Sequence, residues 1–127
     1  MHVLITEARF GDADDVVTSL RGAGCHVTRC HERVGICRAL APGGHCPLDG
    51  RDHVDLVVDV RARLPELTAR EYGAVCAVRA RIPLAIVSAT GEVPVVPPGL
   101  EHRAAAVTKA ELVGACRVAM RDEVGVG

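Results

Sequence analysis

Aromatic residues are almost missing from this chain, which has no tryptophan, one tyrosine and one phenylalanine among 127 residues. Its core must therefore be built from aliphatic side chains, since hydrophobic residues still make up 49% of the sequence. Val, Ile and Leu pack well on both faces of a parallel sheet. The length predicts a single domain, spanning residues 1–127.

An excess of positive charge is also missing. The 15 basic and 16 acidic residues give a formal net charge of −1. This balance offers neither the basic face that nucleic acids require nor a polybasic membrane patch. No apolar run approaches the ~18 residues of a spanning helix, and the first seven residues do not resemble a signal peptide. We therefore expect a cytoplasmic protein with no nucleic-acid or membrane partner.

Six cysteines are present. In a reducing compartment they indicate core packing, metal ligation or redox chemistry rather than disulfides. Cys76 and Cys116 fall on apolar stripes of expected helices, so we predict that both pack in the core.

Short apolar runs alternate with helical patterns along the chain. Helices are expected to begin after Asp12 and at two capping boxes, Thr68 to Glu71 and Thr108 to Glu111. Such alternation predicts an α/β domain with a parallel sheet. The expected strands cover residues 3–6, 26–29, 54–60, 82–88 and 104–107.

Several strand-end segments, taken in order, resemble one known family. They are Val3–Ala8, Gly24–Val27, Asp55–Asp59, Ile82–Ala89 and Ala106–Lys109. Together they resemble a CheY-like response-regulator receiver domain over most of the chain. The resemblance implies a flavodoxin-like, doubly wound sheet of five parallel strands in the order 2-1-3-4-5.

The resemblance also implies a phosphoacceptor-like pocket. By position, Asp59 corresponds to the phosphoacceptor that ends the third strand, and Glu7 to an acid beside Mg²⁺. Ser88 corresponds to the hydroxyl, and Lys109 to the cation that contacts the phosphoryl oxygens. Three of these residues also have a plain structural interpretation: Asp59 as a solvated strand-end charge, Ser88 as a strand-end hydroxyl and Lys109 as a first-turn helix residue.

Two departures from the family pattern weaken this pocket. Ala8 stands where the second metal-side acid belongs, which weakens a Mg²⁺ site. The spacing from Asp55 to Asp59 differs by one residue, and one residue reverses the face of a strand. We therefore expect a stand-alone degenerate receiver-like signalling or interaction domain that is not conventionally phosphorylated and is not an enzyme. A protein partner is expected, with a homodimer as one form of it.

Residues 30–53 form an insertion with three cysteines and two histidines. Cys30, Cys37 and Cys46, with His31 and His45, are residue types that bind Zn²⁺ or an iron–sulfur cluster. A metal- or redox-sensing function of this loop is the alternative hypothesis. No Cys-x-x-Cys pair is present, and Cys37 also fits the inner face of a short helix. A small enzyme is the third hypothesis, but no glycine-rich phosphate loop follows the first strand.

Overall fold

A computed structural model of the chain describes residues 1–9, 11–29, 53–61, 71–90, 94–97 and 99–125, and the structural statements below concern these residues. Five strands form one sheet in which every neighbouring pair is parallel, in the order β2-β1-β3-β4-β5. This confirms the predicted flavodoxin-like topology. The strands are β1 (His2–Glu7), β2 (His26–Arg29), β3 (Leu56–Arg61), β4 (Leu84–Ser88) and β5 (Ala104–Val107).

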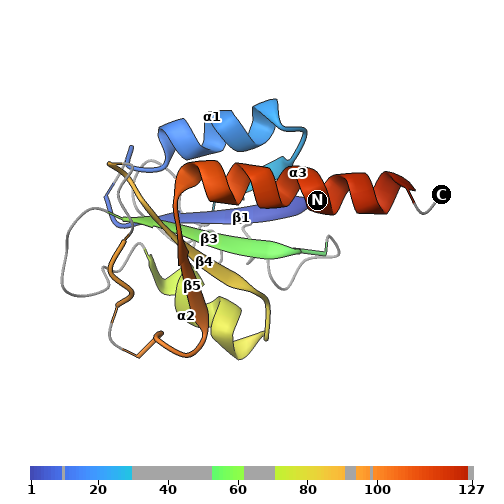
Figure 1. Cartoon of the computed structure of the whole chain (residues 1–127). Coiled ribbons are helices and arrows are strands. Elements are labelled where there is room, and N and C mark those ends of the chain that lie inside the picture. The colour runs from blue at the N-terminus through green and yellow to red at the C-terminus, as the bar shows by residue number, and fades with distance from the viewer. Residues whose placement is uncertain (10, 30–52, 62–70, 91–93, 98, 126–127) are drawn as a thin grey trace, which may run out of the picture.

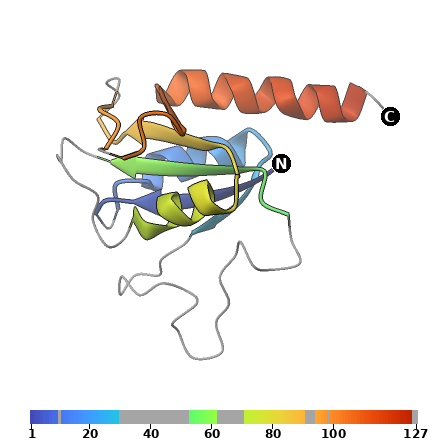
Figure 2. The ribbon, with the colours of Figure 1, turned by 90° about the horizontal axis from the view of Figure 1, so that it is seen from below.

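In the described part of the chain, three helices cover the two faces of the sheet. Helices α1 (Asp14–Gly22) and α3 (Lys109–Gly125) lie side by side on one face, and α2 (Tyr72–Arg79) lies on the other (Figure 1). Seen at right angles, α3 runs past the edge of the sheet toward the C-terminus (Figure 2). None of the described helices has the length and apolar character needed to cross a membrane.

Alternation along the strands divides the buried aliphatic residues into two cores. Val3, Ile5 and Val58 pack in the core beneath α1 and α3, whereas Leu4 and Val57 pack in the core beneath α2. All five are at most 1% exposed. Because side chains on a strand alternate between faces, the same rule assigns the faces of the polar residues nearer the strand ends.

The third strand is longer at its carboxyl end than expected. Asp59 pairs with Thr6 on one side and Ile86 on the other, and β3 continues to Arg61 opposite Ser88. The receiver resemblance places Asp59 at the end of this strand, whereas β3 runs to Arg61, one residue beyond the expected range of 54–60. The strand continues because the ladder with β4 extends to Ser88, and this leaves Asp59 inside the sheet rather than at its rim.

Helix starts and cysteines give mixed outcomes. The Thr108–Glu111 capping box is confirmed: the Glu111 amide donates to Thr108 Oγ1 at 3.2 Å, and the Thr108 amide donates to Glu111 Oε1 at 3.4 Å.

The buried position predicted for Cys116 is also confirmed, and burial, together with the neighbouring Cys25, raises its pKa to about 11. The core position predicted for Cys76 was wrong, since this side chain is exposed. It lies on the outer side of the short helix α2.

Candidate functional site

Glu7 holds the carboxyl end of β1 to the start of α1. Its side chain is buried, and its Oε2 accepts a hydrogen bond from the backbone N–H of Ala13 at 3.0 Å. The first N–H groups of a helix have no partner within the helix, and a carboxylate also suits the positive end of the helix dipole. The expected cap, Asp12, instead accepts a hydrogen bond from the Arg9 amide at 3.2 Å.

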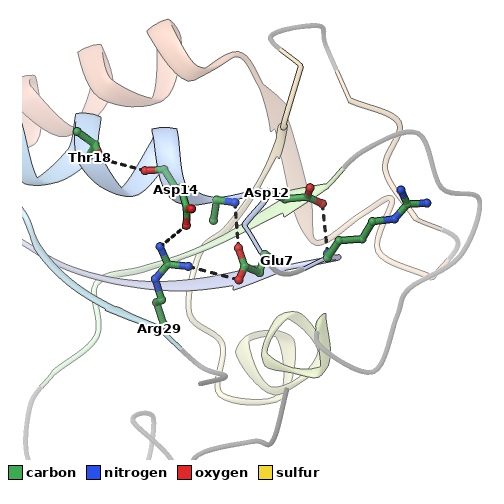
Figure 3. A network of polar contacts seen from close by, with 7 residues as sticks. Glu7, Asp12, Asp14, Thr18 and Arg29 are labelled. Carbon is green, nitrogen blue, oxygen red and sulfur yellow. Dashed lines mark hydrogen bonds and ion pairs between the residues drawn. The ribbon is translucent and has the colours of Figure 1, made fainter. Parts of the chain in front are cut away.

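One arginine bridges two acidic side chains at this edge of the sheet (Figure 3). Arg29, the last residue of β2, places Nη1 3.3 Å from Glu7 Oε1 and Nη2 2.8 Å from Asp14 Oδ1. The planar guanidinium thus bridges a carboxylate from β1 and a carboxylate from α1, as its fork of donors allows. Asp12 lies in the same acidic region, and partial burial, followed by the charge of Glu7, raises its pKa against the lowering effect of the Arg9 amide.

A second polar cluster lies inside the opposite layer, beneath α2. Arg61 Nε lies 3.0 Å from Glu71 Oε2, and Arg61 Nη2 donates to Glu71 Oε1 at 3.4 Å. The two side chains are 2% and 0% exposed, so this ion pair is fully removed from solvent. Glu71 directly precedes α2, and its carboxylate binds Arg61. Thr68, the other half of the expected capping box, lies outside the described residues, so that box stays a prediction.

Asp59 is the third titratable residue in this buried cluster, beside Arg61 and Glu71. Its Oδ1 accepts a hydrogen bond from the Thr6 hydroxyl at 2.7 Å. Burial first, and then the hydrogen bond and negative charge of Glu71, raise the pKa of Asp59 to about 9, while Thr6 and Arg61 act in the opposite direction. Asp59 Oδ2 has no hydrogen-bond donor among the described residues when the group is ionised. When the carboxyl group carries a proton, it can donate a hydrogen bond to Glu71, and this favours the protonated form. Burial and the neighbouring Glu71 thus favour the protonated form of Asp59, because both raise its pKa.

The four residues expected to share one pocket are divided between different surroundings. Glu7 lies on the α1 face of the sheet and Asp59 on the α2 face, by the alternation that places Val3 and Val57 on those faces. Ser88 bonds to Thr90, whose amide donates to Ser88 Oγ at 3.1 Å. Lys109, at the start of α3, forms an ion pair with Asp15 of α1.

The donor set at this edge does not fit Mg²⁺. Glu7 is engaged by Arg29 and the Ala13 amide, and buried Ala8 supplies no oxygen from its side chain. Within the described ranges, no group of three or more His, Cys, Asp or Glu residues is placed to hold a metal ion. The predicted metal ligands Cys30, His31, Cys37, His45 and Cys46 lie outside the described residues, so that site stays a prediction.

Sequence reasoning missed the residues that organise both clusters. Arg29 and Asp14 carry no local motif, since their contact depends on β2 lying beside β1. Asp59 and Arg61, however, are two residues apart in an otherwise apolar strand. Two charges at that spacing share one buried face, and this pattern was the available sign of an internal ion pair. Glu71 was not recognised as the partner of Arg61, because Glu71 also fits the capping-box pattern.

Comparison with known proteins adds no relative to this geometry. No family model matches the chain, and neither the curated proteins nor the solved structures contain a match to it. The interpretation of the site therefore depends on its own residues: a neutral, buried Asp59 on one face and a guanidinium-bridged acid pair on the other.

Proposed function

We propose that this chain is a receiver-like signalling domain that acts by binding a protein partner and whose phosphoryl-accepting chemistry has been replaced by internal ion pairs. The observation that carries the proposal is the position of Arg29. It lies at the carboxyl edge of the sheet, where ligands bind in doubly wound folds, and it contacts both Glu7 and Asp14.

The charges support this replacement. Phosphoryl transfer to an aspartate requires an ionised, accessible carboxylate and a divalent cation that neutralises the developing negative charge. Asp59 is 0% exposed, and its raised pKa keeps it protonated at pH 7. Arg29 supplies positive charge permanently where a bound cation would supply it reversibly. The conformation of this edge is then independent of phosphorylation, and binding of a partner is the remaining way for it to signal.

Amide NMR spectra recorded with Mg²⁺ and beryllofluoride test the proposal. For the wild type we expect no shift of the resonances of Glu7, Asp59, Ser88 and Lys109. The Arg29→Gln variant should gain Mg²⁺-dependent shifts at Glu7 and Asp14, because both carboxylates lose their counterion. Arg21→Gln, which changes an exposed arginine of α1, is the matched control and should stay silent.

Beryllofluoride-dependent shifts at Asp59 and Lys109 of the wild type would contradict the proposal. So would stoichiometric phosphorylation of Asp59 by acetyl phosphate, detected by mass spectrometry. For a protein partner captured by crosslinking, the proposal predicts the same affinity, within about twofold, with and without acetyl phosphate. A tenfold difference, equivalent to ~1.4 kcal/mol, would show that phosphorylation controls binding.

A further inference from the structure

The C-terminus of α2 carries an arginine in a backbone conformation that favours glycine. Arg81 has φ of +58° and is the one non-glycine residue with positive φ in the described part of the chain. The Arg81 amide donates to the Val78 carbonyl at 3.2 Å, and the Ile82 amide donates to the Ala77 carbonyl at 3.0 Å. These two bonds define a Schellman motif, whose left-handed residue is usually glycine.

Helix α1 ends in the same motif and uses glycine. Gly24 has φ of +97°; its amide donates to the Arg21 carbonyl at 3.0 Å, and the Cys25 amide donates to the Leu20 carbonyl at 3.0 Å. A side chain in this conformation costs about 1–2 kcal/mol relative to the right-handed region, a cost that glycine avoids. The arginine at the end of α2 is therefore present in spite of the local backbone preference.

A cavity beside this turn provides a reason for the arginine. Its volume is about 380 Å³, and its described lining consists of Val78, Arg81, Ile82, Pro83 and Arg103. This volume falls within the range of small-molecule sites. Two arginines from separate segments line the cavity together with three apolar residues, and its described lining includes no acidic residue.

Among the described residues, neither of these two arginines forms an ion pair. The nearest acid to Arg103 in the sequence, Glu101, accepts a hydrogen bond from the Gly99 amide at 2.8 Å. The negative end of the α2 dipole favours Arg79 and Arg81. It does not account for Arg103, which comes from the turn before β5. Two cations lining one cavity repel each other, and an anion between them removes that repulsion.

We propose that this cavity binds a small organic anion, with its carboxylate or phosphate group held by Arg81 and Arg103 and its apolar body against Val78, Ile82 and Pro83. Guanidinium groups bind such oxyanions through paired hydrogen bonds. The site lies where β4 and β5 begin, at the end of the sheet opposite the Glu7–Arg29 contact, and it does not depend on the proposed receiver-like function.

NMR titration with phenyl phosphate, inorganic phosphate and benzyl alcohol tests this site. Phenyl phosphate supplies both the anion and the apolar body, whereas each of the other two compounds supplies one part. We expect phenyl phosphate to shift the amide resonances of Arg81, Ile82 and Arg103, inorganic phosphate to bind more weakly, and benzyl alcohol to leave them unchanged. Equal affinity for phenyl phosphate and inorganic phosphate would contradict the apolar contact.

Three variants separate binding from folding. Arg81→Gly and Arg103→Gln should each weaken phenyl phosphate binding about tenfold or more, in keeping with the loss of a charged hydrogen-bond donor. Arg81→Gly should also raise Tm, because it relieves the left-handed conformation, whereas Arg103→Gln should leave Tm nearly unchanged. Arg79→Gln, two residues away on the same helix but outside the cavity lining, is the control and should bind normally. Undiminished binding by both cavity variants would overturn the proposal.

Discussion

The two faces of the sheet carry the same kind of ion pair in opposite surroundings. On the α1 face, Arg29 is 29% exposed and its partner Asp14 is 68% exposed. On the α2 face, Arg61 and Glu71 are 2% and 0% exposed. Water can replace the lost partner of the exposed Asp14 on the first face, whereas no partner of the pair on the second face is exposed to water. The comparison therefore predicts that equivalent substitutions will have much larger effects beneath α2 than beside α1.

Breaking the buried pair should have the largest effect. Arg61→Met removes the guanidinium group that contacts the buried Glu71 carboxylate, and we expect the free energy of unfolding to fall by about 3–5 kcal/mol. Urea denaturation measures this loss. The double variant Arg61→Met/Glu71→Met removes both charges and should recover most of it. A loss below ~1 kcal/mol in the single variant would contradict the burial of this pair.

Asp59 should make the stability of the α2 face depend on pH. Its pKa is 3.8 in the unfolded chain and about 9 in the fold, so the folded state holds the extra proton between these values. Its contribution to stability is complete below pH ~4 and is lost as the pH rises to ~9, at up to ~1.4 kcal/mol per pH unit. Asp59→Asn keeps the shape without a titrating proton and should flatten this slope and stabilise the fold above pH 7. An unchanged slope in urea titrations across this range would show that Asp59 is not the group responsible.

The α1-face network should respond more weakly and depend on salt. Arg29→Gln removes the bridge between Glu7 and Asp14, and we expect a loss of about 1 kcal/mol, because Glu7 retains its hydrogen bond to Ala13. Since Asp14 faces solvent, the difference between variant and wild type should shrink in 1 M NaCl. A loss as large as that of Arg61→Met would remove the distinction between the two faces.

The ion pair between Lys109 and Asp15 should have the smallest effect. These side chains are 40% and 74% exposed, and exposed pairs contribute little. Lys109→Ala should change the free energy of unfolding by less than ~0.5 kcal/mol. Asp15→Ala offers the matched measurement from the other partner, and a loss above 1 kcal/mol in either variant would show that this contact orders α1 and α3.

The alternation of strands and helices was sufficient to predict a parallel α/β sheet, although β2, His26–Arg29, is barely apolar. The strand order was implied by the receiver resemblance, and the Thr108–Glu111 cap followed from local hydrogen bonding. The position of Asp59 inside the sheet was harder to predict, since β3 continues past it to Arg61, which pairs with Ser88 of β4. The contact of Glu71 with Arg61 is a tertiary one that the local capping-box pattern gives no sign of.

The partner of Arg29 was beyond local reasoning for a similar reason. Nothing near Arg29 in the sequence indicates Glu7 or Asp14; the contact exists because β2 pairs with β1 in a parallel register that sets Arg29 opposite Ile5. Long-range register of this kind requires the whole sheet. The left-handed backbone conformation of Arg81 could not be predicted from the sequence either, because its sequence neighbours resemble an ordinary helix end.

The protonation state of Asp59 at neutral pH is the most direct test of an internally neutralised site. Carbon-13 NMR of the side-chain carboxyl group, assigned with Asp59→Asn, reports it without perturbing the fold. The account predicts a protonated carboxyl at pH 7 that titrates at about pH 9. A carboxyl group already ionised at pH 7, with a midpoint near 4, would contradict it and restore Asp59 as an available nucleophile.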